Sequence, residues 1–326
     1  MNKFASTIAR FSKQTIVAVA DLVADEFVFG EIARVSREAP VLILKRRESH
    51  YVPGGGANAI YNLAALGARV LPVGVVGDDA PGHALLDAFQ KRHIDRSGIL
   101  IDPKFSTTTK TRILAGTIHG SRQQVLRIDR EPREPLSAES HKTIATTASR
   151  WAHEASGTLI SDYGYGAATP LLAARLNRIA PIVTVDSRYD ILSYRGATAA
   201  TPNEPEVEAA LHERIGADSA RLELCGRRML ARMKTKALLI TRGRDGMALF
   251  EPRRPTQHIP IYGPTEGADV TGAGDTVIAV FTLALAAGAD FATAAHLANY
   301  AGGIVVMKRG TATVSAAELR AAAGGA

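Results

Sequence analysis

Short apolar runs alternate with stretches of helical periodicity along most of this chain, and that alternation limits the folds available to it. The apolar runs are IVAVAD (16–21), VLPVGVVG (70–77), TLISD (158–162), IVTVD (182–186) and ALLIT (237–241). The helical stretches cover residues 58–66, 81–92, 138–153, 170–179, 204–215 and 220–233. Strands that alternate with helices pair in parallel, because each helix carries the chain back across the sheet. The sequence therefore predicts an α/β fold of three layers, with helices on both faces of a mostly parallel central sheet.

Polar residues end three of these runs, namely Asp162, Asp186 and Thr241. The carboxyl ends of parallel strands meet at one edge of the sheet, where α/β proteins bind their ligands. Two strand-rich segments, at about 27–52 and 112–129, interrupt the alternation and predict a small β lid above that edge. No Pro- or Ser-rich linker divides the chain, so residues 1–326 are expected to form a single domain with this lid.

The composition fits a globular protein with a large core, since 46% of the 326 residues are apolar. The longest apolar run, residues 277–289, is shorter than the roughly 20 residues that a membrane span needs, so no membrane partner is expected. The single cysteine, Cys225, excludes an internal disulfide and fits a cytoplasmic location. Residues 1–14 are basic and lack acids, which indicates a surface helix or arm, with a transit peptide as the weaker alternative.

The net charge of +7 comes from Lys and Arg residues scattered along the chain. Such a charge fits either a phosphorylated small-molecule ligand or an ordinary solvated surface. Basic clusters interleaved with aromatic residues are missing, so nucleic acid is not an expected partner. The nine histidines do not pair with one another or with cysteine at metal-ligand spacing, so no structural metal site is expected.

The stretch D-V-T-G-A-G-D-T (269–276) places a glycine-rich turn at the start of a long apolar helical segment. Amides in such a turn, together with the positive end of a helix, hold negative charge that develops during phosphoryl transfer. Asp275 at the helix start is placed to accept the proton of an attacking hydroxyl. The alternative is that Asp275 only caps the helix, but capping explains neither Asp269 nor the two glycines.

The run G-G-G-A-N-A (54–59) matches the dinucleotide pattern G-x-G-x-x-A, which leaves a nicotinamide oxidoreductase as a remote alternative. The run follows Pro53 rather than the first strand, and Pro53 does not suit a central strand. Asn58 is better placed to bond a ligand hydroxyl or to cap a helix. The patterns of P-loop enzymes, G-x-x-x-x-G-K-[ST], and of α/β-hydrolases, G-x-S-x-G, do not occur in the sequence.

Two further motifs follow strands in the second half of the chain. In T-P-N-E-P-E (201–206), Asn203 and Glu206 stand one helical turn apart. This spacing suits either the hydration shell of a magnesium ion or a helix capping box. T-R-G-R-D-G (241–246) predicts a tight turn that can approach a nucleotide, although by itself it is an ordinary hairpin connection.

Taken in this order, the GGGAN run, the N-x-x-E pair, the T-R-G-x-D-G turn and D-V-T-G-A-G-D-T resemble the ribokinase-like, or phosphofructokinase B (PfkB), carbohydrate kinases. The resemblance runs from about residue 17 to residue 319. It implies an ATP-dependent sugar kinase with a ribokinase-like body of about nine strands and a β lid, which is expected to join two copies as a homodimer. ATP and Mg²⁺ are the implied cofactors, with K⁺ beside Asp269 and Thr271 as an open alternative.

The resemblance also implies roles for individual residues. Asp275 is the expected base, and the amides of Gly272, Ala273 and Gly274 form the expected anion hole. The residues expected to contact the sugar are Asp21, Gly55, Gly56, Asn58 and Asp162, with Lys110, Arg112 and Arg127 as weaker candidates for a distal phosphate. The residues expected along ATP are Asn203, Arg188, Thr241, Gly243, Gly246, Thr271 and Asn299, while Glu206 is expected to act on magnesium through water.

Within the family, several stretches are similar to the D-glycero-β-D-manno-heptose 7-phosphate kinases of lipopolysaccharide core synthesis. They include RVSREAPV (34–41), TKTRIL (109–114), SDYGYG (161–166), VDSR (185–188) and YRGAT (194–198). Tyr165 and Arg188 stand where this group usually has lysine, and Arg37 stands where it has proline, which leaves the exact sugar open. The chain ends soon after the kinase region, so a kinase without a nucleotidyltransferase half is expected. Another sugar kinase of the family and a non-catalytic sugar-phosphate sensor are the alternatives.

Overall fold

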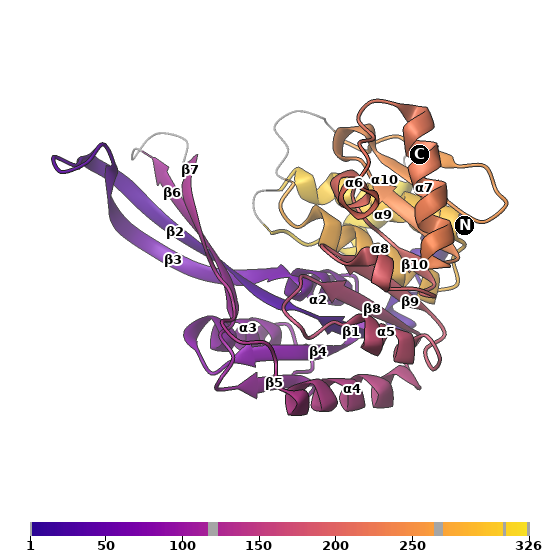
Figure 1. Cartoon of the computed structure of the whole chain (residues 1–326), viewed down its shortest axis with the longest axis horizontal. Coiled ribbons are helices and arrows are strands. Elements are labelled where there is room, and N and C mark those ends of the chain that lie inside the picture. Colours follow the sequence, from indigo (N-terminus) through magenta and orange to yellow (C-terminus); the bar gives the residue numbers. More distant parts are fainter. Residues whose placement is uncertain (1, 117–122, 264–269, 309–310, 325–326) are drawn as a thin grey trace.

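The computed structural model describes residues 2–116, 123–263, 270–308 and 311–324, and in these ranges the body is built around one large sheet (Figure 1). Its nine strands lie in the order β13-β12-β11-β10-β9-β8-β1-β4-β5. The pairs from β11 to β5 are parallel, whereas β12 and β13 are antiparallel to their neighbours. Their bounds are β1 Thr15–Ala20, β4 Arg69–Gly77, β5 Ile99–Asp102, β8 Gly157–Asp162, β9 Val183–Ser187, β10 Ala199–Ala200, β11 Ala237–Thr241, β12 Met247–Phe250 and β13 Gln257–Ile259.

Helices cover both faces of this sheet, and each face has its own buried apolar cluster. One layer contains α1 Lys3–Ile8, α2 Gly56–Ala65, α3 Ala80–Lys91, α8 Ala273–Ala286, α9 Phe291–Val306 and α10 Ala316–Gly324. The other contains α4 Ala138–Ala152, α5 Pro170–Leu176, α6 Glu204–Leu211 and α7 Ser219–Met233. Short 3-10 turns lie at Phe11–Lys13, Ile191–Ser193 and Gly243–Asp245. In the described ranges, none of the helices combines the length and apolar character needed to cross a membrane.

The five predicted apolar runs form β1, β4, β8, β9 and β11, so the expected three-layer α/β fold is confirmed. The helix expected at 204–215 is shorter, because α6 ends at Leu211 and His212 adopts a left-handed conformation with φ of 54°. The helix expected at 170–179 likewise ends early, at Leu176. Within residues 2–14, α1 is followed by a 3-10 turn that buries Phe11, which agrees with the expected surface helix.

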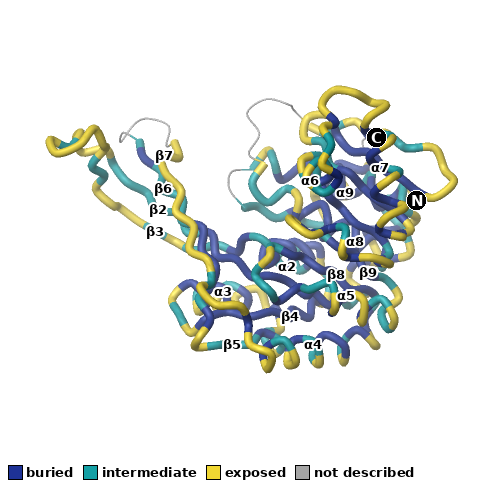
Figure 2. The backbone as a smooth tube through the Cα atoms, viewed as in Figure 1, coloured by how far each residue is buried: buried dark blue, intermediate teal, exposed yellow. Residues whose placement is uncertain are grey.

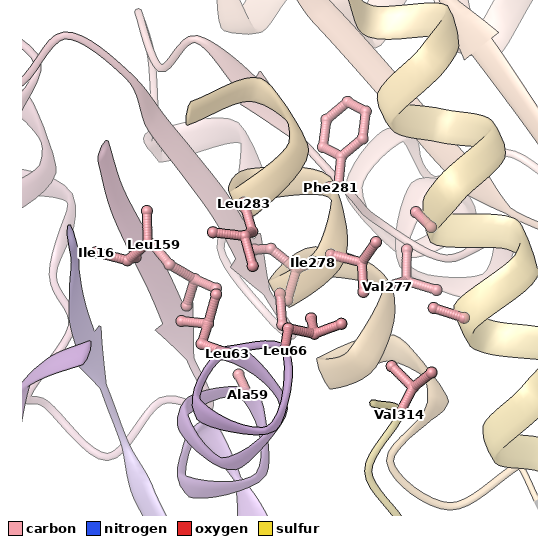
Figure 3. Close-up of a cluster of buried hydrophobic side chains, with 14 of the residues drawn as sticks. Ile16, Ala59, Leu63, Leu66, Leu159, Val277, Ile278, Phe281, Leu283 and Val314 are labelled. Atoms are coloured by element: carbon pink, nitrogen blue, oxygen red, sulfur yellow. The ribbon is translucent and has the colours of Figure 1, made fainter. Parts of the chain in front are cut away.

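The core on one face of the sheet centres on α8, whose residues from Asp275 to Leu285 are all buried. Figure 3 shows Ile278, Phe281 and Leu283 of α8 among Leu63 and Leu66 from the α2 region and Leu159 of β8. A helix that is apolar on all sides belongs in the interior. The tight packing around α8 fixes the position of its first turn, which lies at the carboxyl edge of the sheet.

The lid is a four-stranded sheet that projects from the body as a long arm (Figure 1). Its order is β3-β2-β6-β7, with bounds β2 Leu22–Val35, β3 Leu42–Gly55, β6 Thr108–Gly116 and β7 Gln123–Arg130. These strands begin earlier than expected at 27–52 and 112–129, because β2 starts only one residue after β1 and shares the buried base of the arm. Residues 117–122 of the expected lid lie outside the described ranges. Figure 2 shows that burial falls from the base of the arm to its tip.

Candidate active site

The first turn of α8 holds a buried carboxylate, that of Asp275, which is 3% exposed. The Tyr163 hydroxyl donates to its Oδ1 at 2.7 Å, and Nδ2 of Asn58 donates to its Oδ2 at 3.2 Å. Gly272 caps the helix with φ of 76°, and a Cβ atom there would lie 2.5 Å from Nδ2 of Asn58. Glycine is therefore required at this position both by backbone conformation and by the close approach of Asn58.

Burial is the main cause that raises the pKa of Asp275, to about 7. The hydrogen bonds from Tyr163 and Asn58 oppose this rise, because they stabilise the ionised carboxylate. Among nearby charges, Asp25 raises the pKa of Asp275 and Lys110 lowers it. A carboxylate with a pKa close to neutral is suited to accept a proton at physiological pH.

Asp275 lies in the first turn of α8, and the first amides of a helix have no acceptor within the helix, so this helix start is suited to an anion. The three expected amides are not equivalent. The amide of Ala273 donates to the carbonyl of Val270 at 3.2 Å and closes the turn. Gly274 is exposed, and apart from its chain neighbours and the backbone of its own helix no heavy atom lies within 4 Å of the position that a Cβ would take.

Asp21 lies at the end of β1 as expected, but its carboxylate is turned to the protein interior and is 1% exposed. Its Oδ2 accepts the amides of Tyr163 and Tyr165 at 2.9 Å, and its Oδ1 accepts the amide of Ala167 at 2.8 Å. Burial raises the pKa of Asp21 to about 6, although these amides act in the opposite direction. In the structure Asp21 therefore holds the 163–167 loop, and its contact with a sugar stays a prediction.

Asp25, four residues later on β2, was not predicted, and its charge acts on Asp275. Its carboxylate forms an ion pair with Arg112 at 2.6 Å and raises the pKa of Asp275. A Cβ atom on Gly54 would lie 2.6 Å from this carboxylate, so the glycine run passes directly over Asp25. The alternation of Asp25, Phe27 and Phe29 on one face of a strand is the signal that could have revealed it.

The three predicted cations, Lys110, Arg112 and Arg127, share one face of the lid, because Arg112 pairs with Arg127 in register and Lys110 stands two residues before Arg112. Arg127 bonds Asp129 through two contacts of 2.5 and 2.7 Å. Lys110 is 8% exposed, and its ammonium lies 4.9 Å from the centre of the Tyr163 ring. Burial lowers the pKa of Lys110, the charge of Asp25 raises it, and Arg188 and Arg127 lower it.

A cavity of about 790 Å³ opens between α8, α9 and the β11–β12 hairpin. It is lined by five residues that were expected along a nucleotide: Asn203, Thr241, Gly243, Gly246 and Asn299. The hairpin is closed by the amide of Arg242 and the carbonyl of Gly246 at 2.9 Å, with Gly243 at its tip. Nδ2 of Asn299 donates to the carbonyl of Pro260 at 2.8 Å, which fixes the wall next to α9.

A second cavity, of about 190 Å³, joins the nucleotide-sized cavity to Asp275. Its wall contains the carboxylates of Asp162, Asp186 and Glu206 and the side chain of Arg188. Burial and the charges of Glu206, Asp275 and Asp162 raise the pKa of Asp186 well above its usual range. Burial also raises the pKa of Glu206 to about 7, against the effect of Arg188. Repulsion among these carboxylates marks a place where a cation is favoured.

Asn203 and Glu206 form the capping box that was one of the two alternatives for their spacing. The amide of Glu206 donates to Asn203 Oδ1 at 2.8 Å, and the amide of Asn203 donates to Glu206 Oε2 at 2.9 Å. Both residues also line the 190 Å³ cavity. Within the described ranges, no three His, Cys, Asp or Glu side chains are grouped closely enough to coordinate a metal directly. The carboxylates of Asp162, Asp186 and Glu206 in the wall of this cavity fit a magnesium ion that keeps most of its waters.

The remaining predicted residues lie around the same centre. Gly55 ends β3 with φ of 51°, and a Cβ atom on it would lie 3.2 Å from the Tyr163 ring. Gly56 begins α2, where its amide donates to the carbonyl of Asp21 at 3.2 Å. Asp162 accepts the Ser187 hydroxyl at 2.7 Å and lines the smaller cavity, beside Arg188 rather than beside the lid. Thr271 directly precedes the turn at Gly272, and Asp269 lies outside the described ranges.

Comparisons with known proteins identify the family of this chain. The family model described as "pfkB family carbohydrate kinase" matches residues 22–318. A relative named "Bifunctional protein HldE" from Geobacter metallireducens is 43% identical over 308 residues, which cover 93% of this chain and 61% of the relative. One of the same name from Desulfatibacillum aliphaticivorans is 39% identical over 319 residues, or 96% and 64% of the two chains. This chain thus spans less than two thirds of the length of these relatives.

The fold is shared with solved kinases of lower identity. Arabidopsis thaliana ribokinase, in complex with ribose and ATP, has a TM-score of 0.74 at 17% identity, with 95% of this chain and 98% of that chain covered. Phosphofructokinase-2 from Escherichia coli, in complex with substrates and products, has a TM-score of 0.77 at 16% identity and the same coverage. The fold is therefore ribokinase-like. The chain belongs to the pfkB family of carbohydrate kinases, and it is an ATP-dependent sugar kinase.

The environment of Asp275 predicts how activity depends on pH. If Asp275 accepts the proton of the sugar hydroxyl, only its ionised form is active, and its raised pKa places the change near pH 7. We expect kcat to fall about tenfold for each pH unit below this midpoint. Initial rates of ADP release between pH 5 and 9, at saturating ATP and sugar, measure this acidic fall of kcat. A midpoint near 4, typical of an exposed aspartate, would contradict the assignment of Asp275 as the base.

Proposed function

We propose that this kinase transfers the γ-phosphoryl group of ATP to the O1 hydroxyl of D-glycero-D-manno-heptose 7-phosphate, giving the 1,7-bisphosphate. This reaction would supply ADP-heptose for the lipopolysaccharide core. The resemblance of TKTRIL (109–114), SDYGYG (161–166) and VDSR (185–188) to kinases of this substrate supports the proposal. The identity of 37–43% to relatives named HldE is consistent with it, although those relatives are longer.

The observation that carries the substrate proposal is the cationic face of the lid beside the base. Lys110 contacts the ring of Tyr163, which in turn bonds Asp275, so a positive charge lies close to the acceptor side of the site. The charges of Arg188 and Arg127 disfavour the protonated form of Lys110, and a bound phosphate dianion would remove that penalty. A sugar that carries a phosphate far from its reacting hydroxyl can place the hydroxyl beside Asp275 and the phosphate beside these cations.

In the proposed mechanism, Asp275 accepts the proton of the sugar O1 hydroxyl as the oxygen attacks the γ-phosphorus. A bond forms between O1 and phosphorus, and the bond from phosphorus to the bridging oxygen of ADP breaks. Amides at the start of α8, with Gly274 the most open of them, stabilise the charge on the transferred group. Asp25 and the backbone of Gly55 and Gly56 hold the sugar.

The nucleotide is assigned to the 790 Å³ cavity, with its phosphates directed to the smaller cavity and to Arg188. Asn203, Thr241, Gly243, Gly246, Thr271 and Asn299 are the proposed ATP contacts. Glu206 and Asp186 would hold magnesium largely through water, and the ion would neutralise charge on the terminal phosphates. Whether K⁺ joins Thr271 stays a hypothesis, since Asp269 lies outside the described ranges.

A screen of ADP release across sugar acceptors tests the function. We expect turnover with D-glycero-β-D-manno-heptose 7-phosphate to exceed that with ribose, fructose or fructose 6-phosphate by at least about 100-fold in kcat/KM, roughly 2.8 kcal/mol. Asp275→Asn is expected to keep the fold and lose about 10²- to 10⁴-fold in kcat, the usual contribution of a general base. Preferential use of ribose or fructose would reject the heptose assignment and leave the kinase class intact.

Lys110→Met tests the site proposed for the distal phosphate, because methionine keeps an unbranched side chain but removes the charge. We expect KM for the sugar phosphate to rise about 10- to 100-fold, since a hydrogen bond to a charged group contributes about 1.5–3 kcal/mol. KM for ATP should stay within about twofold. Lys104→Met, at an exposed lysine near the start of β6, is the matched control. An equal loss with sugars that lack a phosphate would show that Lys110 does not recognise the phosphate.

We also propose that two copies join through the lid. Thr111 pairs with Ile128 and Ile113 with Leu126, so these side chains share the face opposite Lys110 and Arg112. On that face Leu126 and Ile128 are exposed by 53% and 52%. An apolar face of a small sheet is stabilised when another apolar surface covers it. A second copy of the lid offers the same surface under two-fold symmetry.

Leu126→Glu tests this interface, because a carboxylate on each of two facing lids introduces repulsion and desolvation. We expect a dimer for the parent and a monomer for Leu126→Glu in sedimentation velocity experiments. Leu224→Glu on α7 is the matched control, since Leu224 is also 53% exposed but lies on the body. A parent that sediments as a monomer at micromolar concentration, or a Leu126→Glu variant that stays dimeric, would contradict the lid interface.

A further inference from the structure

The two oxygens of the Asp275 carboxylate are held differently. Oδ1 accepts a short hydrogen bond, 2.7 Å, from the Tyr163 hydroxyl. Oδ2 accepts a longer one, 3.2 Å, from Nδ2 of Asn58, which also lies 3.2 Å from the Gly272 carbonyl and is shared between the two acceptors. Oδ1 is thus the more strongly engaged oxygen, and Oδ2 keeps more of its capacity to accept a proton.

Tyr163 is itself fixed by the body of the protein. The carboxylate of Asp21 accepts the amide of Tyr163 and two further amides of the same loop, those of Tyr165 and Ala167. The Lys110 ammonium lies over the Tyr163 ring, and Gly55 approaches the same ring closely. A tyrosine held at both its backbone and its ring delivers its hydroxyl to a defined point with little loss of entropy on binding.

We propose that Tyr163 is a positioning residue of phosphoryl transfer, whose hydroxyl fixes Oδ1 of Asp275 and thereby aims Oδ2 at the incoming sugar hydroxyl. The inference rests on the proposed role of Asp275 as the base. In the step, the proton passes from the sugar hydroxyl to Oδ2, the sugar oxygen bonds to the γ-phosphorus, and ADP leaves with the bridging oxygen. Tyr163 keeps its own proton throughout, and its donated bond stabilises Asp275 only while the carboxylate is charged.

The groups around Tyr163 and Asp275 favour the protonated form of the Tyr163 hydroxyl. Burial and the negative charges of Asp275 and Asp186 raise the pKa of Tyr163 well above its usual range, while Arg188 acts in the opposite direction. Around Asp275, the facing groups are Tyr163 from the loop after β8, Asn58 from α2, Asp25 from β2 and Lys110 from β6. Of these four residues, Tyr163 and Asn58 hydrogen-bond the side chain of Asp275 within the described ranges.

Tyr163→Phe removes only the hydroxyl and keeps the ring under Lys110, so it tests positioning directly. We expect kcat with heptose 7-phosphate to fall about 10- to 100-fold, with KM for ATP and for the sugar within about twofold. Loss of the donor should also raise the pKa of Asp275, so the acidic limb of the kcat profile should move to higher pH. Tyr61→Phe is the matched control, because it removes a hydroxyl that donates to the Ala88 carbonyl at 2.8 Å, outside the site.

A second measurement needs no substrate. The ¹³C carboxyl resonance of Asp275, identified by its loss in Asp275→Asn, should titrate at higher pH in Tyr163→Phe than in the parent or in Tyr61→Phe. If Tyr163→Phe does not fold, Asp21→Asn is expected to move the same resonance in the same direction, because it weakens the anchor of the loop.

The outcomes separate the inference from the proposed function. Parental kcat with an unmoved acidic limb in Tyr163→Phe would overturn the inference, and so would a raised sugar KM with unchanged kcat, which would make Tyr163 a sugar contact. Substantial turnover by Asp275→Asn would instead remove the base on which both proposals depend. An inactive Asp275→Asn together with a fully active Tyr163→Phe would leave the proposed function standing and reject the positioning role alone.

Discussion

The arrangement of this site depends on one energetic constraint, the burial of a carboxylate at the start of an apolar helix. Asp275 is 3% exposed, and removing a charge from water is costly unless the charge is hydrogen-bonded. Tyr163 and Asn58 supply those bonds, and the positive end of α8 adds favourable charge. The cost that remains appears as the raised pKa of Asp275. Dense packing around α8 holds the carboxylate in place. Because the carboxylate stays buried, its pKa lies near neutral pH.

The site is also a boundary between two sets of charges. Toward the nucleotide-sized cavity lie the carboxylates of Asp186 and Glu206, which favour a cation. Toward the lid lies the cationic face that contains Lys110, which favours an anion on the acceptor. Asp275 stands between them. In the proposed reaction, this separation keeps the like charges of the metal-bound nucleotide and the phosphorylated sugar apart.

Sequence alone predicted the local part of this site and missed the part formed across the fold. The turn at Gly272 and the proposed base, Asp275, are three residues apart, so the motif contains their geometry. The capping box of Asn203 and Glu206 is local in the same way. Asp21 ends a strand as the sequence indicated, but the sequence did not reveal that its carboxylate turns inward to bind a loop 142 to 146 residues away. The sequence did not indicate the contact of Tyr163 with Asp275, because Asp275 is 112 residues further along the chain.

The join between lid and body also connects the arm to the candidate active site. β1 ends at Ala20 and β2 begins at Leu22, so Asp21 is the only residue between the strand that anchors the body and the strand that forms the arm. Opposite it, Leu22 pairs with Gly55, where the arm returns to α2. Because the Asp21 carboxylate also accepts the amide of Tyr163, the residue that links body and arm is bonded to the loop that carries the hydroxyl donor of Asp275.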